Sequence, residues 1–248
     1  MPNSSRKVFP PRDTETHDLQ TWLAELPKAE LHLHLEGAIP IDSLWSLIER
    51  HGGDPSAPTK EALRQQLTYS DFPEFIEKWN WKNNFLRTYD DFSFIAEEVA
   101  RDLVRQNILY AELFFSPSRF ADRGLTVIGL AEAIRRGLDK VPGCEIWLIA
   151  DLVRDHGPEQ AAITLAEATK ARHYGIVGIG IGGSEHLFPP EPFAEVFAEA
   201  RRLGFKTNAH AGEASGSNSV RGAVQSLLVD RIGHATRAED DPELLQLL

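Results

Sequence analysis

The chain has 248 residues, of which 42% are hydrophobic and 25% charged, a balance typical of one large globular domain. Its formal net charge of −11 argues against nucleic acid as a partner, because neutralising phosphates requires an excess of Lys and Arg. The single cysteine, Cys144, excludes an internal disulfide and a cysteine-rich zinc cluster, and no apolar run is long enough to span a membrane.

Residues 1–25 form a polar, proline-bearing N-terminal extension. The stretch from Met1 to Asp18 lacks the apolar core of a secretory signal, so we expect a cytoplasmic protein. The rest of the chain contains neither low-complexity tracts nor sequence repeats, and we predict a single domain.

The first predicted strand, Glu30–Gly37, carries His32 and His34, two histidines one residue apart. Alternate side chains of a strand share a face, so both imidazoles point to one side and the neighbouring leucines to the other. Two neutral imidazoles on one strand are a ready pair of ligands for a zinc-type ion. The alternative is an amphipathic strand whose polar face happens to be histidine, and the pair alone does not decide between them.

A long interval, residues 38–105, separates the first strand from the second. It contains the helical pattern Ile41–Arg50 and the aromatic stretch Phe72–Phe85, and we interpret it as a helical insertion that covers one end of the sheet as a lid. Beyond it, short apolar runs alternate with amphipathic helices, which implies a parallel sheet. The predicted strands are Glu30–Gly37, Leu109–Ser116, Glu145–Leu152, Ile176–Gly182, Phe205–Ala211 and Arg231–Ala235.

A doubly wound sheet and a TIM-type barrel both fit this alternation. Polar candidate residues lie at or just past the ends of several strands, and a barrel gathers such ends around one mouth. We therefore predict an α/β fold, a TIM-type (β/α)8 barrel. The residues at these strand ends are His34, Ser116, Asp151, Gly183, His210 and His234.

The later strands end in residues that suit a metal site. His210 is a candidate third ligand, Glu213 is a carboxylate close to the ion's open position, and His234 ends the next strand. Gly183 follows the fourth strand, where glycine lets backbone N–H groups approach a ligand. Each also has a structural interpretation: a hydrogen-bonded rim histidine, an acid favoured by a helix dipole, or a turn glycine.

One strand-end residue is expected to be structural. Asp151 ends the third strand and is followed three residues later by Arg154, which we interpret as its ion-pair partner.

Four runs in order resemble the adenosine deaminase family of metal-dependent hydrolases. They are His-Leu-His-Leu-Glu-Gly-Ala (32–38), Gly-Gly-Ser-Glu (182–185), His-Ala-Gly-Glu (210–213) and Arg-Ile-Gly-His (231–234). The resemblance extends from about Leu26 to the end of the chain, and parts of 75–92 resemble the family's lid region. Several ordered motifs at matching intervals are far more specific than any one of them.

The resemblance implies a Zn²⁺ ion held by His32, His34 and His210, together with an aspartate on the eighth strand. It implies that Glu213 is the proton shuttle and that His234 orients and activates the metal-bound water. The implied reaction is hydrolytic deamination at C6 of an adenine-type nucleoside or base, with release of ammonia.

The resemblance also implies two substrate contacts. Gly183 would present its backbone N–H to a purine ring nitrogen, and Glu36 would contact the sugar side or the wall of the pocket. The implied partner is a small-molecule purine.

The largest departure from the family lies after the Arg-Ile-Gly-His strand. Family members continue through two more strands, the last with an Asp-Asp pair, whereas this sequence stops at Leu248. We therefore expect about six of the eight strands, an incomplete barrel over residues 1–248, and three of the four metal ligands. Asp240-Asp241-Pro242 follows His234 too closely to substitute, and we interpret it as a helix N-cap.

Smaller departures concern the substrate. Gly180 and Ala235 stand where relatives usually have aspartate and glycine, and Trp79 and Trp81 make the lid unusually aromatic. These differences point to a purine derivative other than plain adenosine, such as adenine or aminodeoxyfutalosine.

Two other functions compete with a zinc aminohydrolase. The first is a non-catalytic or partner-dependent fragment, motivated by the missing aspartate strand. The second is a different metal-dependent amidohydrolase, of the kind that often bridges two metals with a modified lysine. The strands 146–151 and 176–182 contain no lysine, which disfavours this second alternative.

Overall fold

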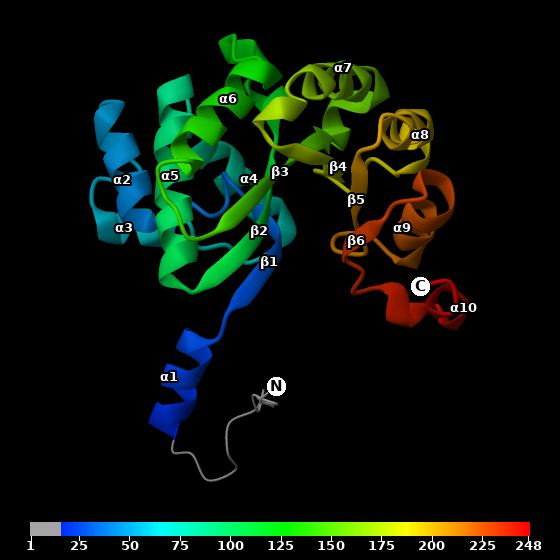
Figure 1. The fold of residues 1–248 in the computed structure, drawn as a ribbon, viewed down its shortest axis with the longest axis horizontal. Helices are drawn as coiled ribbons and strands as arrows, with labels where there is room; N and C mark the ends of the chain where they lie inside the picture. Colours follow the sequence, from blue (N-terminus) through cyan, green and yellow to red (C-terminus); the bar gives the residue numbers. More distant parts are fainter. Residues whose placement is uncertain (1–15) are drawn as a thin grey trace, which may run out of the picture.

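The computed structural model describes residues 16–248, with side chains from Leu19 onward, so most of the predicted N-terminal extension lies outside the described residues (Figure 1). The strands are β1 (Lys28–His34), β2 (Ile108–Phe115), β3 (Glu145–Val153), β4 (Ile176–Gly182), β5 (Lys206–Ala211) and β6 (Arg231–His234). The helices are α1 (Thr16–Glu25), α2 (Ile41–Arg50), α3 (Lys60–Gln66), α4 (Phe72–Asn83), α5 (Tyr89–Arg105), α6 (Val127–Leu138), α7 (Gly157–Lys170), α8 (Ala194–Arg202), α9 (Ser217–Gly222) and α10 (Pro242–Leu245).

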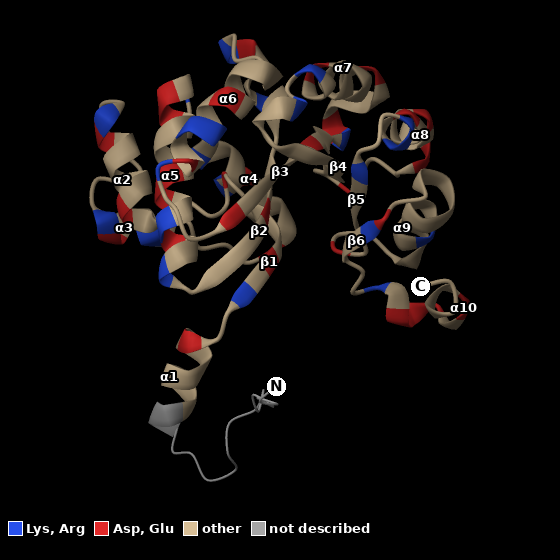
Figure 2. Ribbon diagram, in the orientation of Figure 1, with Lys and Arg blue, Asp and Glu red and all other residues tan. Residues whose placement is uncertain are grey.

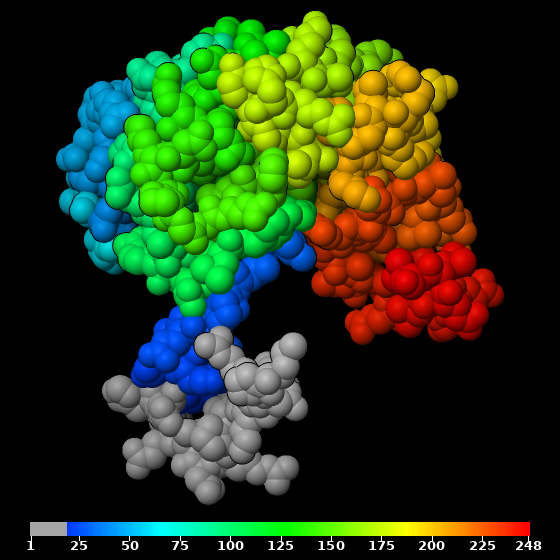
Figure 3. Space-filling model, in the orientation of Figure 1, coloured from blue at the N-terminus to red at the C-terminus, as the bar shows by residue number. Residues whose placement is uncertain are grey.

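The six strands lie side by side in chain order, and every neighbouring pair is parallel. The sheet curls from β1 to β6, with α5 to α9 on its outer side, and an opening separates the two ends of the molecule (Figures 1 and 3). This is the expected TIM-type barrel architecture with six of its strands present. Because all strands run in one direction, their carboxyl ends meet at one mouth.

The first strand ends earlier than the sequence pattern predicts. The carbonyl oxygen of His34 accepts hydrogen bonds from the N–H groups of Gly37 and Ala38, both at 2.9 Å, so the chain turns directly after this histidine. The turn leaves His34 as the last residue of β1, at the mouth of the barrel.

The outer helices bury the apolar stripes that the sequence indicates. In α5 the stripe includes Phe92 and Val99, and it packs against α6, where Ile134 is fully buried. A capping box begins α5, because the Thr88 hydroxyl accepts from the Asp91 N–H at 3.2 Å and the Asp91 carboxylate accepts from the Thr88 N–H at 2.9 Å.

The interval between β1 and β2 contains the helices α2, α3, α4 and α5. Of these, α4 supplies side chains to the mouth of the barrel, whereas α5 packs on the barrel side with α6. The division of the chain into an extension, a lid and a barrel stays a prediction.

Lys or Arg and Asp or Glu residues both occur along the outer helices α2, α5, α6 and α8 (Figure 2). None of the helices between residues 16 and 248 combines the length and the apolar character that crossing a bilayer requires.

Candidate metal centre and active site

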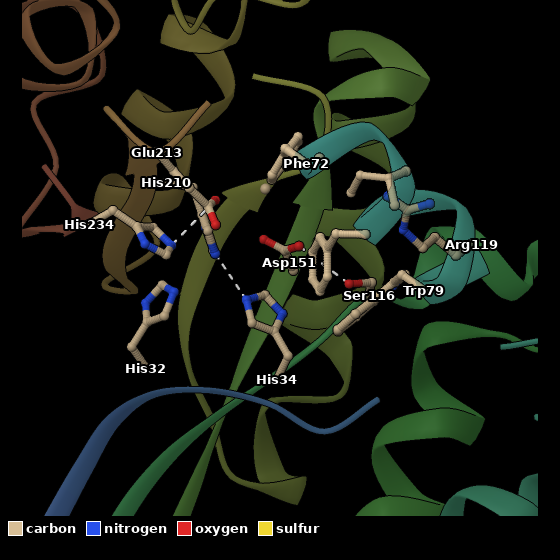
Figure 4. A pocket seen from close by; sticks show the side chains of 14 residues that line it. His32, His34, Phe72, Trp79, Ser116, Arg119, Asp151, His210, Glu213 and His234 are labelled. Atoms are coloured by element: carbon tan, nitrogen blue, oxygen red, sulfur yellow. Dashed lines mark hydrogen bonds and ion pairs between the residues drawn. The ribbon is translucent and has the colours of Figure 1, made fainter. Parts of the chain in front are cut away.

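Three histidines from two distant strands converge at the mouth of the barrel. His32 and His34 come from β1, and His210 comes from β5 (Figure 4). One ring nitrogen from each lies within 4.8 Å of the other two, and the Nε2 atoms of His34 and His210 are 2.9 Å apart. The structure therefore brings together the three residues that the sequence analysis proposes as metal ligands.

Local packing explains how the imidazoles reach one another. Backbone pairing of β4 with β5 is confined to Gly178–Lys206 and Ile179–Thr207, so the strands part toward the mouth. There His210 bridges them, its Nδ1 lying 3.0 Å from the carbonyl oxygen of Ile181. Gly233 on β6 gives His32 room, because a Cβ at that position would lie 2.5 Å from the imidazole Cε1.

All three imidazoles are held in the neutral form. Burial is the main cause that lowers the pKa of His32 to about 4 and that of His34 to about 3. Neighbouring histidines and basic side chains add to this effect. Burial also lowers the pKa of His210 well below its ordinary value. Each ring therefore keeps a free lone pair at neutral pH.

The donor set fits a zinc-type ion. A carbonyl only accepts, so Nδ1 of His210 carries the proton and its Nε2 lone pair faces His34. Two nitrogens that each lie about 2.0–2.1 Å from a tetrahedral zinc ion are roughly 3.3–3.4 Å apart. This is close to the 2.9 Å between the Nε2 atoms of His34 and His210. Nδ1 of His32 and Nδ1 of His34 are buried without a hydrogen-bond partner among the described residues. Three neutral imidazoles suit a cation.

A carboxylate and a fourth histidine face this group. Nε2 of His234, the last residue of β6, lies 3.4 Å from Oε2 of Glu213 in the loop after β5. Burial is the largest influence on Glu213 and raises its pKa, although His234 acts in the opposite direction. A carboxyl group with a raised pKa beside an imidazole is suited to moving protons.

The chain turns sharply after β6. His234 has φ +70° and Ala235 has φ +54°, a left-handed conformation that costs energy for residues other than glycine. The glycine that the resemblance leads one to expect at position 235 would relieve part of this strain.

The two predicted substrate contacts occupy different places. Gly183 lines the cavity beside the histidines with φ +104°, and a Cβ there would lie 2.1 Å from Oδ2 of Asp155. Glu36 is fully buried and accepts a hydrogen bond from the Ser116 N–H at 2.9 Å. It lines a neighbouring cavity together with Lys82. The structure thus brings Gly183 to the histidine cavity, whereas Glu36 lines a separate one.

The expected ion pair between Asp151 and Arg154 is not formed among the described residues. Arg154 instead donates to the carbonyl oxygens of Phe188 and His210, both at 2.7 Å. Asp151 lies in the cavity, where the Ser116 hydroxyl donates to its Oδ2 at 3.3 Å and its Oδ1 is buried without a partner. Burial raises its pKa to about 7.

The cavity that holds these groups has a volume of about 200 Å³. Aromatic side chains from α4, including Phe72 and Trp79, form one wall, and Arg119 lies at the edge near Ser116 (Figure 4). The aromatic stretch is evident from the sequence, whereas Arg119 was not predicted. Its position shortly after β2, past a strand end, is the signal that could have indicated it.

Comparison with known proteins identifies the family. A model of the adenosine deaminase family matches residues 27–248. The chain belongs to the adenosine deaminase family. An adenine deaminase from Bordetella avium is 38% identical over 232 residues, which cover 92% of this chain and 72% of that protein. An aminodeoxyfutalosine deaminase from Streptomyces avermitilis is 36% identical over 241 residues, which cover 94% of this chain and 67% of that protein.

Solved structures agree with this family assignment. An adenine deaminase from Arthrobacter aurescens superposes with a TM-score of 0.80 at 29% identity, covering 89% of this chain and 68% of that one. A zinc-bound amidohydrolase from Burkholderia ambifaria gives a TM-score of 0.84 at 29% identity, covering 94% of this chain and 65% of that one. The chain thus has the fold of the metal-dependent amidohydrolases and is an aminohydrolase of the adenosine deaminase family.

Proposed function

We propose that this protein catalyses the zinc-dependent hydrolytic deamination of an adenine-type base or nucleoside. The observation that carries the proposal is the convergence of three neutral imidazoles, His32, His34 and His210, with Glu213 and His234 around one cavity. The names of the relatives, which include adenine and aminodeoxyfutalosine deaminases, support a substrate with a 6-aminopurine ring.

The three histidines would hold the zinc ion. When bound, zinc lowers the pKa of a coordinated water to about 7 and so supplies a nucleophile at neutral pH. The neutral state of the ligands, which burial enforces, leaves their lone pairs available for the ion.

Glu213 and His234 would move the protons. Glu213, with its raised pKa, donates a proton to the ring nitrogen N1 while the water oxygen bonds to C6 and His234 accepts the water proton. The 6-amino group then takes the proton from His234, the C6–N bond breaks and ammonia leaves. The hydroxyl proton at C6 returns to Glu213, and the product is a 6-oxopurine.

Other groups would hold the purine. Phe72 and Trp79 of α4 line the cavity and are suited to contact the purine ring. We therefore propose that α4 is the part of the predicted lid that contacts the substrate. The backbone N–H of Gly183 is proposed to meet a ring nitrogen. Asp151, protonated for part of the neutral range, can donate to or accept from the purine edge.

The test is ammonia release by the intact native enzyme from adenine, adenosine and aminodeoxyfutalosine, with purine as a control that lacks the leaving group. We expect turnover of at least one compound, loss of turnover after metal chelation, and recovery on addition of zinc. Failure to release ammonia from any 6-aminopurine with zinc present would reject the function and favour a non-catalytic protein.

A further inference from the structure

The loop that carries Glu213 is fastened by a second glutamate. Glu185, in the segment after β4, is 4% exposed. Its Oε1 accepts a hydrogen bond from the Gly212 N–H at 2.6 Å, and its Oε2 accepts from the N–H groups of Glu213 at 3.1 Å and Ala214 at 2.7 Å. One buried carboxylate thus binds three consecutive backbone donors.

Further contacts restrict the conformation of this loop, in addition to the hydrogen bonds that Glu185 accepts. Gly212 has φ +76°, and a Cβ there would lie 2.8 Å from Cγ2 of Val220, so the turn requires glycine. The Thr236 hydroxyl donates to the Gly212 carbonyl oxygen. The loop conformation therefore depends on contacts on both sides of the chain, and the Glu185 carboxylate supplies the charged ones.

The buried guanidinium of Arg154 lies close to the same loop. Arg154 is 1% exposed and donates to the carbonyl oxygen of His210 at 2.7 Å. Its guanidinium and the Glu185 carboxylate attract one another, which offsets part of the cost of burying both charges. Together they hold the end of β5 on its carbonyl side and the following loop on its N–H side.

We propose that Glu185 is a positioning residue that aims the Glu213 side chain at the substrate ring. This inference rests on the proposed function, because it concerns the proton donor of that reaction. Glu185 makes hydrogen bonds to the backbone of Glu213 and its neighbours and does not line the histidine cavity. Its effect on the reaction is therefore exerted through the loop and through the negative charge of its carboxylate, which adds to the burial that raises the pKa of Glu213.

The geometry requires a full-length carboxylate. Glutamine keeps the shape but replaces one acceptor oxygen with an NH2 donor, which would face backbone donors. Aspartate keeps the charge but draws the oxygens back by about one C–C bond, roughly 1.5 Å. Glutamine should therefore disturb the loop most and aspartate less.

The experiment compares Glu185→Gln and Glu185→Asp with the matched control Glu195→Gln, an exposed residue of α8. For Glu185→Gln we expect kcat to fall on the order of 10²-fold, the cost typical of a small misplacement of a reacting group. KM should change little, zinc content should stay at the wild-type level, and Glu185→Asp should recover part of the rate. Glu195→Gln should match wild type.

The double variant Glu185→Gln with Glu213→Gln decides whether the effect passes through Glu213. Because the second substitution already removes the proton donor, we expect no further loss of kcat. A multiplicative loss, or wild-type kcat in Glu185→Gln, would overturn the inference. If Glu185→Gln does not fold or loses zinc, the same comparison of single and double variants is made with Glu185→Asp in its place. A wild-type enzyme inactive on every 6-aminopurine would instead reject the proposed function itself.

Discussion

The Nε2 atoms of His34 and His210 lie 2.9 Å apart, although 176 positions separate the two residues in the chain. The carbonyl oxygen of Ile181 fixes the proton of His210 on Nδ1, so a lone pair faces His34 across this distance. A lone pair in this position can accept a hydrogen bond from His34 or bind a cation.

Removal of one of these imidazoles should therefore abolish tight metal binding. We expect His210→Ala to lower zinc affinity by at least about 100-fold, because it leaves only the two ligands of β1. Zinc content after dialysis measures this. His173→Ala, at an exposed histidine that contacts Tyr174, is the matched control. Retention of a full equivalent of zinc by His210→Ala would show that this residue is not a ligand.

Glu213→Gln separates proton transfer from metal binding. Glutamine has the same size but cannot donate the carboxyl proton, so we expect kcat to fall by about 10²–10⁴-fold while zinc content and the thermal midpoint stay unchanged. Steady-state kinetics and metal analysis on one preparation provide the comparison, with the exposed Glu239→Gln as control. A near-normal rate in Glu213→Gln would show that another group moves the proton.

Asp151 should make stability depend on pH in the metal-free protein. Burial raises its pKa from 3.8 to about 7 in the folded chain. The folded state then keeps a proton that the unfolded state releases, so this carboxyl lowers stability as pH rises through that window. At pH of about 8, Asp151→Asn should be more stable than wild type by about 1–3 kcal/mol, and the difference should vanish below about pH 4.

Urea denaturation of the metal-free protein at both pH values measures the effect of Asp151→Asn. Asp122→Asn, at an exposed aspartate, should show no such pH-dependent gain. Greater destabilisation of Asp151→Asn at the higher pH would mean that the carboxyl is ionised and well solvated in the folded state.

The turn after β6 offers a test on stability alone. Ala235 has φ +54°, where glycine avoids the clash of a Cβ with the backbone but loses more conformational freedom on folding. We expect Ala235→Gly to raise the free energy of unfolding by up to about 1 kcal/mol in urea denaturation. Ala238→Gly, at a buried position in the next turn, should lower it. Equal destabilisation by both would argue against strain at position 235.

Much of the fold could be predicted from local patterns. The strands of a parallel sheet are apolar runs, and β4 occupies the predicted range Ile176–Gly182. The helix N-cap predicted at residues 240–242 is also confirmed, because Asp241 accepts from the N–H groups of Glu243 and Leu244. The early end of β1 escaped prediction because it depends on a backbone turn at His34 that the apolar pattern does not register.

The parts of the site that were not predicted depend on contacts between distant segments. Asp151 and Arg154 are three residues apart at the end of a strand, so their side chains diverge, and the nearest charge in sequence was not a partner. Glu185 belongs to a recognised motif, but its hydrogen bonds to residues 212–214 exist only once β4 and β5 are placed side by side. No local pattern shows either relationship.

The burial of the histidines also bears on how the proposed metal centre would acquire its ion. A ligand that is protonated before binding must give up its proton, and capture then weakens as the solution becomes acidic. Here His32 and His34 already lack that proton above about pH 4. These two ligands should accordingly release almost no acid when a metal binds near neutrality, so mild acidification of the surroundings would not weaken binding through their protonation.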